Sequence, residues 1–402
     1  MERVILHCDL NNFFASVTLL SNETLKNLPV AVGGSKENRH GIILAKNEIA
    51  KKFGVKTAEP IHEAVSKCPD LVILKPNYKE YNLYSEKARN IYRRYTDLIE
   101  PFGIDECWLD VTGSRLLFGD GETIAQRIRK EIKAELGITA SVGVSFNKVF
   151  AKLGSDYKKP DAVTVISREN FKDIVWPMPV SDLLFVGKQT AARLASCGIF
   201  TVGDLAAADE RTLVRMLGKN GREIKNYAMG LDDSPVLPDN AQGVPKSVGR
   251  SVTLPQDVTT PEEVWRVFLD LAEDIAGTLK DNNLAANGIA VHTRTNTLEV
   301  KEFSFSFSTP TAVAMTLAKR GMEIFEKNYF WHLPLRSVGI RAIHLVPLET
   351  ATQCDMFGEG EEVKKTEEID KKVYNIRKKF GDASIVRGTV LNAHTENKKK
   401  QS

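Results

Sequence analysis

The sequence has few cysteines, no long apolar run and only a small net charge. Its five cysteines are odd in number and far apart, which excludes a disulfide framework and paired zinc-ligand spacing, so we expect them to be reduced and mostly structural. No apolar stretch approaches the roughly 20 residues of a membrane span, and the first residues lack the charged-then-apolar layout of a secretory signal. We therefore expect an intracellular protein.

What is present is an ordinary globular composition. The 402 residues are 42% hydrophobic and 27% charged, which fits a soluble protein of roughly two to four domains. A net charge of +3 does not identify a nucleic-acid partner, because a nearly neutral total can hide a basic groove beside an acidic site. Whether the chain binds nucleic acid has to be judged from where its charged residues lie along the sequence.

Up to about residue 165 the chain alternates strand-like apolar runs with helical patterns, which predicts a mixed α/β domain. The expected strands are Val4–Cys8, Pro29–Val32, Leu71–Leu74, Glu106–Val111, Ala140–Val144 and Ala162–Ile166, and the expected helices include Lys79–Asp97 and Gly121–Leu136. From residue 170 to about 233 the strand signals vanish. Short helical patterns interrupted by glycines indicate a small helical module there.

Residues 234–245 are rich in Pro, Gly and polar residues without periodicity, so we expect a linker. Beyond it, the order strand, helix, strand, strand, helix, strand predicts a compact α+β sandwich with helices on one face of a sheet. The expected elements are Gly249–Leu254, Pro261–Asp281, Gly288–Arg294, Leu298–Phe307, Thr311–Tyr329 and Leu335–Val346. In the charged tail, Lys364–Phe380 has the pattern of a helix.

Two adjacent carboxylates, Asp105 and Glu106, lie in an apolar and aromatic run, and Asp9 ends another buried strand. Burying ionised carboxylates is unfavourable unless a cation or a donor compensates them, so these residues indicate a metal, a basic partner or a catalytic role. Side chains alternate along a strand, so Asp105 and Glu106 can share a metal pair only at a turn, bulge or strand start. Gly103, just upstream, would allow such an irregularity.

Carboxylate oxygens of this kind suit Mg²⁺ held together with substrate phosphates. Two such ions, clamping the attacking and leaving oxygens, serve phosphoryl and nucleotidyl transfer. The alternative is an acidic hairpin that faces solvent, which the neighbours Phe102, Ile104 and Trp108 make less favourable.

Four motifs in order resemble the catalytic core of the Y-family of lesion-bypass DNA polymerases. They are CDLNNFFASV, AKNEIAKKFGVKT, FGIDECWLDVTG and SVGVSFNKVFAKLGSDYKKPDAVTVI, and the similarity continues through KSVGRSVTL to about residue 347. Four motifs in the right order are very specific. The chain is most similar to bacterial members, which implies a cytoplasmic location.

The resemblance implies an α+β multidomain fold with the right-hand polymerase architecture. The palm would comprise residues 1–20 and 79–165, the fingers 21–78, the helical thumb with helix-hairpin-helix motifs 166–233, the linker 234–245, a β-α-β-β-α-β little-finger domain 246–347, and a tail 348–402.

The resemblance also assigns a catalytic centre. Asp9, Asp105 and Glu106 match the catalytic, metal-binding carboxylates of the family, and the backbone carbonyl of Leu10 would add a ligand. The implied cofactor is a pair of Mg²⁺ ions, one lowering the pKa of the primer 3′-hydroxyl and the other neutralising charge on the triphosphate.

Phe14 matches the aromatic steric gate, whose ring would lie where the 2′-hydroxyl of a ribonucleotide would sit. A steric clash is needed there, because an apolar pocket rejects an added hydroxyl only about a hundredfold. Phe13, next to it, is grouped with the nucleotide-binding residues, although its ring suits the core better.

The fingers motif departs from the family pattern. Where family members often carry a Thr or Ser, a Tyr and an Arg that contact the triphosphate, this chain has Ala45, Glu48 and Lys51. Lys51 offers a point charge without a bidentate fork, and Glu48 can pair with it along a helix. The nucleotide-binding candidates are therefore Lys46, Lys51 and, best of them because it lies in the matching Lys-Lys-Pro, Lys159.

Two regions are expected to bind DNA. In the thumb, Gly187 and Lys188 begin one helix-hairpin-helix and Gly221 lies in a second, where backbone N–H groups would bind phosphate, although such glycines are also ordinary helix caps. In the last domain, basic residues lie on or beside expected strands, as a sheet that follows a DNA backbone would need: Lys246, Arg250 and Arg294.

The tail carries Gln353, Asp355, Met356 and Phe357, which resemble the bacterial sliding-clamp-binding peptide: a Gln, a polar spacer and two apolar anchors. The resemblance thus implies a monomeric, template-directed polymerase that adds dNTPs to primer-template DNA and is recruited by the clamp. A different palm-domain nucleotidyl transferase would not need the thumb hairpins. A non-polymerising DNA-binding paralogue is conceivable from the altered fingers, but the intact carboxylates oppose it.

Overall fold

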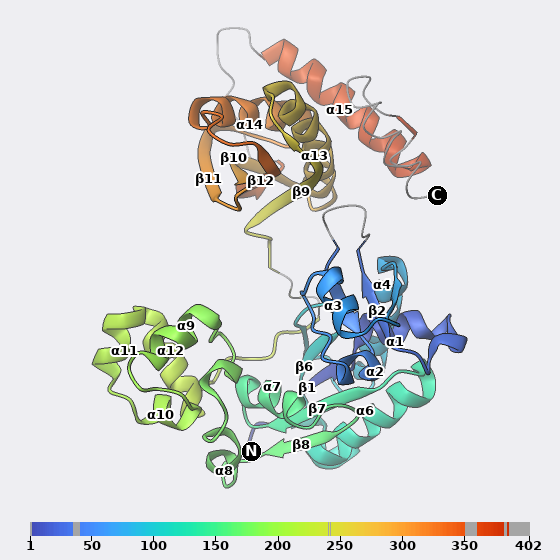
Figure 1. Ribbon diagram of the computed structural model, residues 1–402, viewed down its shortest axis with the longest axis vertical. Coiled ribbons are helices and arrows are strands. Elements are labelled where there is room, and N and C mark those ends of the chain that lie inside the picture. The colour runs from blue at the N-terminus through green and yellow to red at the C-terminus, as the bar shows by residue number, and fades with distance from the viewer. Residues whose placement is uncertain are drawn as a thin grey trace. The chain divides into compact units, whose positions relative to one another are not determined.

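The computed structural model describes residues 2–34, 41–239, 241, 243–349, 360–381 and 384–385, except for the side chains of 360–367. The chain divides into two compact units, Met1–Gln242 and Gly243–Ser402 (Figure 1). None of the helices in the described ranges is long and apolar enough to cross a membrane.

A five-stranded sheet with the order β5-β6-β1-β7-β8 forms the centre of the first unit. Its strands are β1 (Ile5–Leu10), β5 (Ile99–Pro101), β6 (Glu106–Asp110), β7 (Ala140–Ser145) and β8 (Val163–Ile166). In the middle of the sheet β1 pairs antiparallel with both β6 and β7, and β8 extends β7 in parallel.

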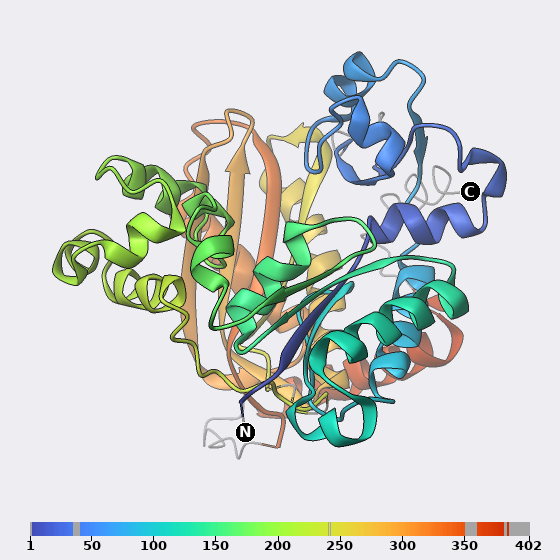
Figure 2. The same cartoon turned by 90° about the horizontal axis from the view of Figure 1, so that it is seen from below.

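Helices cover both faces of this sheet: α4 (Tyr78–Tyr92) and α6 (Gly121–Leu136) on one, and α7 (Lys148–Tyr157) on the other. Side chains alternate along β1, so Leu6 packs into the core formed with α4 and α6, whereas Ile5 packs with Ala151 of α7. In Figure 2 helix α6, in teal, runs beside the dark-blue strand β1. Polar side chains at odd-numbered positions of β1 therefore meet α7.

A three-stranded sheet, β3-β2-β4, lies between α1 and α4 in the chain. Its elements, with the short helices around it, are α1 (Phe13–Leu20), η1 (Glu23–Leu25), β2 (Val30–Gly33), β3 (Ile43–Lys46), α2 (Glu48–Lys52), α3 (Ile61–Lys67) and β4 (Val72–Leu74). Its small core includes Ile43, Ala50 and Ala64, all fully buried.

The rest of the first unit is helical in the described residues. It comprises η2 (Thr112–Ser114), α5 (Arg115–Phe118), α8 (Phe171–Val175), η3 (Val180–Asp182), α9 (Lys188–Ala195), α10 (Val202–Ala207), α11 (Glu210–Leu217) and α12 (Lys219–Ala228). Gly221 allows α11 and α12 to approach closely, because a Cβ there would lie 2.3 Å from the carbonyl oxygen of Leu213.

The second unit has a four-stranded sheet, β11-β10-β12-β9, with two helices packed on one face. The order is β9 (Ser247–Val258), α13 (Pro261–Asp281), β10 (Leu284–Thr295), β11 (Val300–Thr311), α14 (Ala314–Asn328) and β12 (Leu335–Pro347), followed by α15 (Gly360–Phe380). This is the β-α-β-β-α-β order that the sequence pattern predicts.

Three details differ from the sequence expectations. The strands β3 and β5 were not expected. Both lie at the edge of their sheets, and β5 ends in a proline, which interior strands exclude. Helix α4 ends at Tyr92 rather than Asp97. Beyond the end of α4, the carbonyl of Tyr95 accepts a hydrogen bond from the hydroxyl of Ser114, which stabilises a turn there.

Candidate active site

Asp9 and Glu106 are direct neighbours across the β1–β6 pair and lie on the sheet face covered by α7. Their strands are held in this register by the flanking pairs, which place His7 opposite Trp108 on the same face. Asp9 is 5% exposed. Two carboxylates therefore share one largely buried patch of the sheet.

Asp105 immediately precedes β6, in the turn that Gly103 opens with a φ of 94°. The backbone ties this turn to the other carboxylate strand, because the N–H of Leu10 donates to the carbonyl of Asp105 over 3.1 Å. Side chains alternate between the two faces only within a regular strand, and Asp105 lies before the strand begins. Asp105 and Glu106 can therefore approach the same site.

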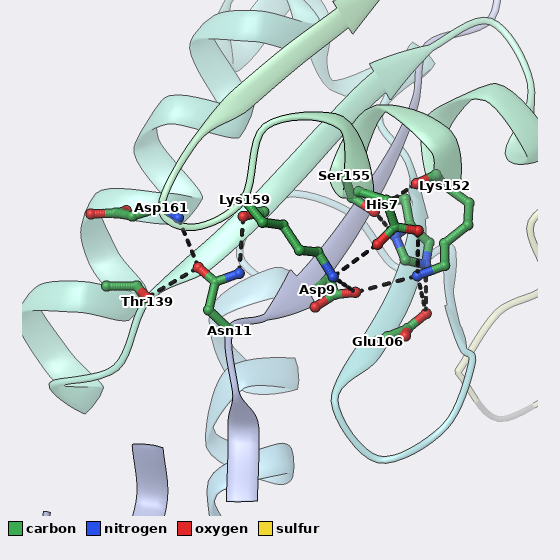
Figure 3. Close-up of polar contacts among 11 residues, drawn as sticks. His7, Asp9, Asn11, Glu106, Thr139, Lys152, Ser155, Lys159 and Asp161 are labelled. Atoms are coloured by element: carbon green, nitrogen blue, oxygen red, sulfur yellow. Dashed lines mark hydrogen bonds and ion pairs between the residues drawn. The ribbon is translucent and has the colours of Figure 1, made fainter. Parts of the chain in front are cut away.

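Lys152 of α7 contacts both paired carboxylates (Figure 3). Its Nζ lies 2.9 Å from Glu106 Oε2 and 3.3 Å from Asp9 Oδ2, and also 3.3 Å from Asp156 Oδ2. Lys159 adds a second ammonium, 2.6 Å from Asp9 Oδ2 and 2.8 Å from Asp156 Oδ1. Three carboxylates and two ammonium groups thus lie within ion-pair distance of one another in this patch.

The pKa values reflect this crowding of charge. Burial, and then the negative charges of Asp9 and Glu106, raise the pKa of Asp105 to about 6. Burial alone would also raise the pKa of Glu106, but the contacts with His7 and Lys152 outweigh it and hold that pKa below its usual value. Asp105 is therefore the carboxylate whose negative charge is least compensated.

His7 and Lys152 were not singled out in the sequence analysis. His7 is fully buried, its Nδ1 lies 2.8 Å from Ser155 Oγ, and its Nε2 lies 3.3 Å from Glu106 Oε2. A histidine in the middle of an apolar strand is a signal that could have been used. No comparable signal distinguished Lys152 from Lys148, the other lysine of its helix, because only packing directs the Lys152 side chain at the carboxylates.

The donor set fits a divalent cation of the hard type, since carboxylate oxygens converge where an ammonium is already stabilised. Within the described ranges no three His, Cys, Asp or Glu side chains are arranged so as to coordinate a metal as they stand. Asp9 and Glu106 are directed instead at Lys152. Binding of a cation would require these carboxylates to turn from the ammonium toward the ion.

Phe14, the expected steric gate, is partly buried and stacks on Tyr81 of α4, with ring centroids 4.3 Å apart. Tyr78 meets the same ring edge-on at 5.8 Å. Phe13 is only 2% exposed and belongs to the core. The ring of Phe14 is thus held at the surface of the core, and that of Phe13 is inside it.

Glu48, Lys51 and Lys46 all have polar partners within the chain. Glu48 Oε1 accepts a hydrogen bond from Asn12 Nδ2 at 2.8 Å and lies 3.6 Å from Lys51 Nζ. Lys46 Nζ donates to Thr57 Oγ1 over 2.9 Å, and its burial lowers its pKa. Asn12 links Glu48 to the loop that follows Asp9.

The DNA-binding candidates fall into different environments. Gly187 and Lys188 are exposed at the start of α9, whereas Gly221 is buried between helices. Arg294 lies on the open face of the second unit's sheet, because its neighbour Thr293 pairs with the core residue Val338. Lys246 is exposed ahead of β9.

Arg250 lies on the opposite face of this sheet from Arg294. It pairs with Ile340, a core residue, so it lies on the side covered by the helices, and its Nη2 is 3.3 Å from Thr278 Oγ1 of α13. The clamp-peptide candidates Gln353, Asp355, Met356 and Phe357 lie outside the described residues.

Two family models match the chain: the impB/mucB/samB family over residues 8–156, and its C-terminal domain over residues 245–356. The chain is 46% identical over 391 residues to the DNA polymerase IV of Acetivibrio thermocellus, covering 97% of this chain and 98% of that protein. It is 36% identical over 391 residues to DNA polymerase IV 1 of Bacillus subtilis, covering 97% and 94%.

A solved structure of a Y-family DNA polymerase chimera of Dbh and Dpo4 matches with a TM-score of 0.76 and 23% sequence identity. The match covers 86% of this chain and 99% of that one. At this identity the likeness concerns the fold, and it agrees with the multidomain α+β architecture expected from the sequence.

Proposed function

This chain belongs to the impB/mucB/samB family, the Y-family of DNA polymerases, and we propose that it catalyses nucleotidyl transfer with Asp9, Asp105 and Glu106 around two Mg²⁺ ions. It is a DNA-directed DNA polymerase of the translesion type that depends on divalent metal ions. The non-polymerising paralogue and the other palm-domain transferase are not favoured, because relatives that match nearly the whole chain are DNA polymerases.

One observation carries the assignment of the catalytic centre. Asp9 and Glu106 are cross-strand neighbours, and one ammonium lies within 3.3 Å of both carboxylates. The site is thus built to stabilise positive charge between these two strands. Mg²⁺, when bound, would acidify the primer 3′-hydroxyl and neutralise the triphosphate. The carbonyl of Leu10 is the proposed backbone ligand.

The chain's own groups would prepare the substrate. Asp9 and Glu106 would hold the divalent ions in place of the Lys152 ammonium, and Lys159, which now contacts Asp9, would bind the phosphate oxygens as a point charge. Lys46 and Lys51 are the further triphosphate candidates. Phe14, supported from behind by Tyr81, would exclude a 2′-hydroxyl by occupying its position.

Primer-template DNA would be bound by exposed backbone and basic groups. The start of α9 at Gly187 and Lys188 offers N–H groups to phosphates, and the open sheet face with Arg294 offers charge. We assign Gly221 to helix packing, and retain Lys246 and Arg250 as candidates. The peptide containing Gln353 and Phe357 is the proposed clamp contact of a monomeric, cytoplasmic enzyme.

Primer extension tests this proposal. The wild type with Mg²⁺ and all four dNTPs should extend a primer in the order the template dictates, and Asp105→Ala should abolish extension. Asp110→Asn is the matched control, because Asp110 is on the same strand but accepts from the N–H of Thr112 away from the site. Absence of template-dependent extension by the wild type would contradict the proposal.

A further inference from the structure

Lys159 lies in the short loop that joins α7 to β8, residues 158–162. Two positions further on, Asp161 is bound from two directions, by a buried amide at the end of β1 and by two cations of α6. Its φ of 54° lies in the left-handed region, which Asp tolerates better than most residues do. Both the backbone and the side chain of the loop are therefore held at this residue.

The buried amide is that of Asn11, which is 4% exposed and lies just beyond β1. As Figure 3 shows, its Oδ1 accepts hydrogen bonds from the N–H of Asp161 over 2.8 Å and from the hydroxyl of Thr139 over 3.0 Å. Its Nδ2 donates to Ser141 Oγ over 2.9 Å. The loop is thus tied to the end of the strand that carries the first carboxylate of the site.

The two cations lie on one face of α6, where Arg129 and Lys133 are four residues apart. Arg129 Nη1 donates to the carbonyl oxygen of Asp161 over 3.0 Å and to its Oδ1 over 2.7 Å. Lys133 Nζ lies 2.8 Å from Asp161 Oδ2. Burial alone would raise the pKa of Asp161, but Lys133 and Arg129 outweigh it and hold that pKa below its usual value. Both carboxylate oxygens of Asp161 therefore have a cation.

This anchor restricts where Lys159 reaches. Lys159 lies two residues before Asp161 and two after Tyr157, the last residue of α7, so its backbone is fixed on both sides. Its Nζ is directed into the carboxylate patch, 2.6 Å from Asp9 Oδ2 and 2.8 Å from Asp156 Oδ1. An ammonium on a long flexible stem returns to one place only if the backbone that carries it is fixed.

We propose that Asp161 is a positioning residue for the triphosphate of the incoming nucleotide, because it fixes the loop to Asn11 and α6 and so holds Lys159 where its ammonium meets the phosphate oxygens. This inference rests on the proposed function, in which Lys159 binds the triphosphate. Asp161 acts through Lys159 and takes no part in bond formation. Loss of the anchor should therefore change the KM for dNTP and leave kcat nearly unchanged.

Insertion of a single dNTP at steady state tests the proposal. Asp161→Ala should raise the KM for dNTP about tenfold, with kcat changed by less than about twofold, as expected from a displaced binding group. Asp161→Asn keeps an oxygen that accepts from Arg129 and a residue that tolerates the left-handed backbone, so it should recover most of the loss.

A double variant shows whether Asp161 acts through Lys159. If it does, Asp161→Ala should raise the KM by no more than about twofold when Lys159→Ala is already present, because the two changes remove one interaction. Effects of unrelated residues would instead multiply. The same rise of about tenfold in both backgrounds would overturn the proposal, because Asp161 would then act without Lys159.

Glu135→Ala is the matched control. Glu135 lies on the same helix, and its Oε2 accepts from Arg94 Nη2 over 2.7 Å, so the variant removes a similar ion pair of α6. Its KM for dNTP should equal that of the wild type. If urea unfolding shows that Asp161→Ala does not fold, Arg129→Gln/Lys133→Gln removes the two cations and keeps the left-handed residue. The same rise in KM without a change in kcat is then expected.

Two further results separate the failure of this inference from that of the proposed function. An unchanged KM in Asp161→Ala, while Lys159→Ala raises it, would overturn the inference about Asp161 alone. An unchanged KM in Lys159→Ala would overturn the assignment of Lys159 to the triphosphate, and the inference about Asp161 with it.

Discussion

The imidazole of His7 lies against the carboxylate of Glu106, with Nε2 3.3 Å from Oε2. Ser155 fixes the other ring nitrogen, and the edge of Trp108 meets the ring at a centroid distance of 5.2 Å. Burial lowers the pKa of His7, which favours the neutral ring. His7 is therefore placed to orient Glu106.

We expect His7→Phe to raise the Mg²⁺ concentration needed for half-maximal primer extension by about 10- to 100-fold, the usual effect of losing a group that orients a metal ligand. His7→Gln, which keeps a hydrogen-bonding group, should recover part of the loss. A Mg²⁺ titration at saturating dNTP measures the effect. An unchanged Mg²⁺ requirement in His7→Phe would assign His7 to packing alone.

The ionised side chain of Asp105 should lower the free energy of unfolding of the metal-free enzyme. Its pKa of about 6 lies above its ordinary value of 3.8, so the folded state loses stability as Asp105 ionises between these pH values. Asp105→Asn cannot ionise. We expect it to increase the free energy of unfolding by about 1–3 kcal/mol above pH 6, with the gain vanishing below pH 4.

Urea unfolding in EDTA at pH 8, 5 and 4 measures this difference. Asp110→Asn is the control, and we expect no such gain from it at pH 8. If Asp105→Asn were as stable as the wild type at pH 8, the charge crowding inferred at this position would be refuted.

Phe14→Ala should reduce discrimination against ribonucleotides to about a hundredfold or less, the level that an apolar pocket achieves without a clash. Phe14→Tyr, which keeps the ring, should discriminate like the wild type. Single-nucleotide insertion of matched dNTP and rNTP pairs gives the ratio of kcat/KM. Equal discrimination by Phe14→Ala and the wild type would remove Phe14 from the sugar-binding site.

Lys159→Ala should raise the KM for dNTP by about 10- to 100-fold, because a charge-assisted hydrogen bond to phosphate contributes about 1.5–3 kcal/mol. Lys51→Ala should have a smaller effect, since its side chain is 51% exposed and already lies near Glu48. Glu48→Gln should lower the KM by removing a negative charge near the triphosphate. A larger rise in the KM for dNTP in Lys51→Ala than in Lys159→Ala would assign the main triphosphate contact to Lys51 instead.

Deletion of residues 353–357 should abolish stimulation of synthesis by the sliding clamp while leaving synthesis without the clamp unchanged. The measurement is primer extension with and without a loaded bacterial clamp. Met356→Ala/Phe357→Ala should reproduce the deletion, since the apolar anchors would supply most of the contact. Loss of synthesis in the absence of the clamp would point to a structural role for this peptide.

Local signals predicted the long elements well. Helices α6 and α13 have the bounds expected from the sequence. Asp120 caps the start of α6, and Gly137, with a φ of 69°, ends it. A capping box of Thr260 and Glu263 caps the start of α13. The fold class was confirmed. The edge strand β5 was missed, because its three residues end in a proline, which is not typical of a strand.

The amino-acid sequence by itself determined the strand-ending Asp9, the acidic pair before and at the start of β6, and the family, because motif order and side-chain chemistry are written along the chain. Only the tertiary structure decided that Lys152 joins Asp9 to Glu106 and that Arg250 lies on the side of its sheet that the helices cover. These features depend on which surfaces pack together. That is set by contacts between residues far apart in the chain, which no local pattern encodes.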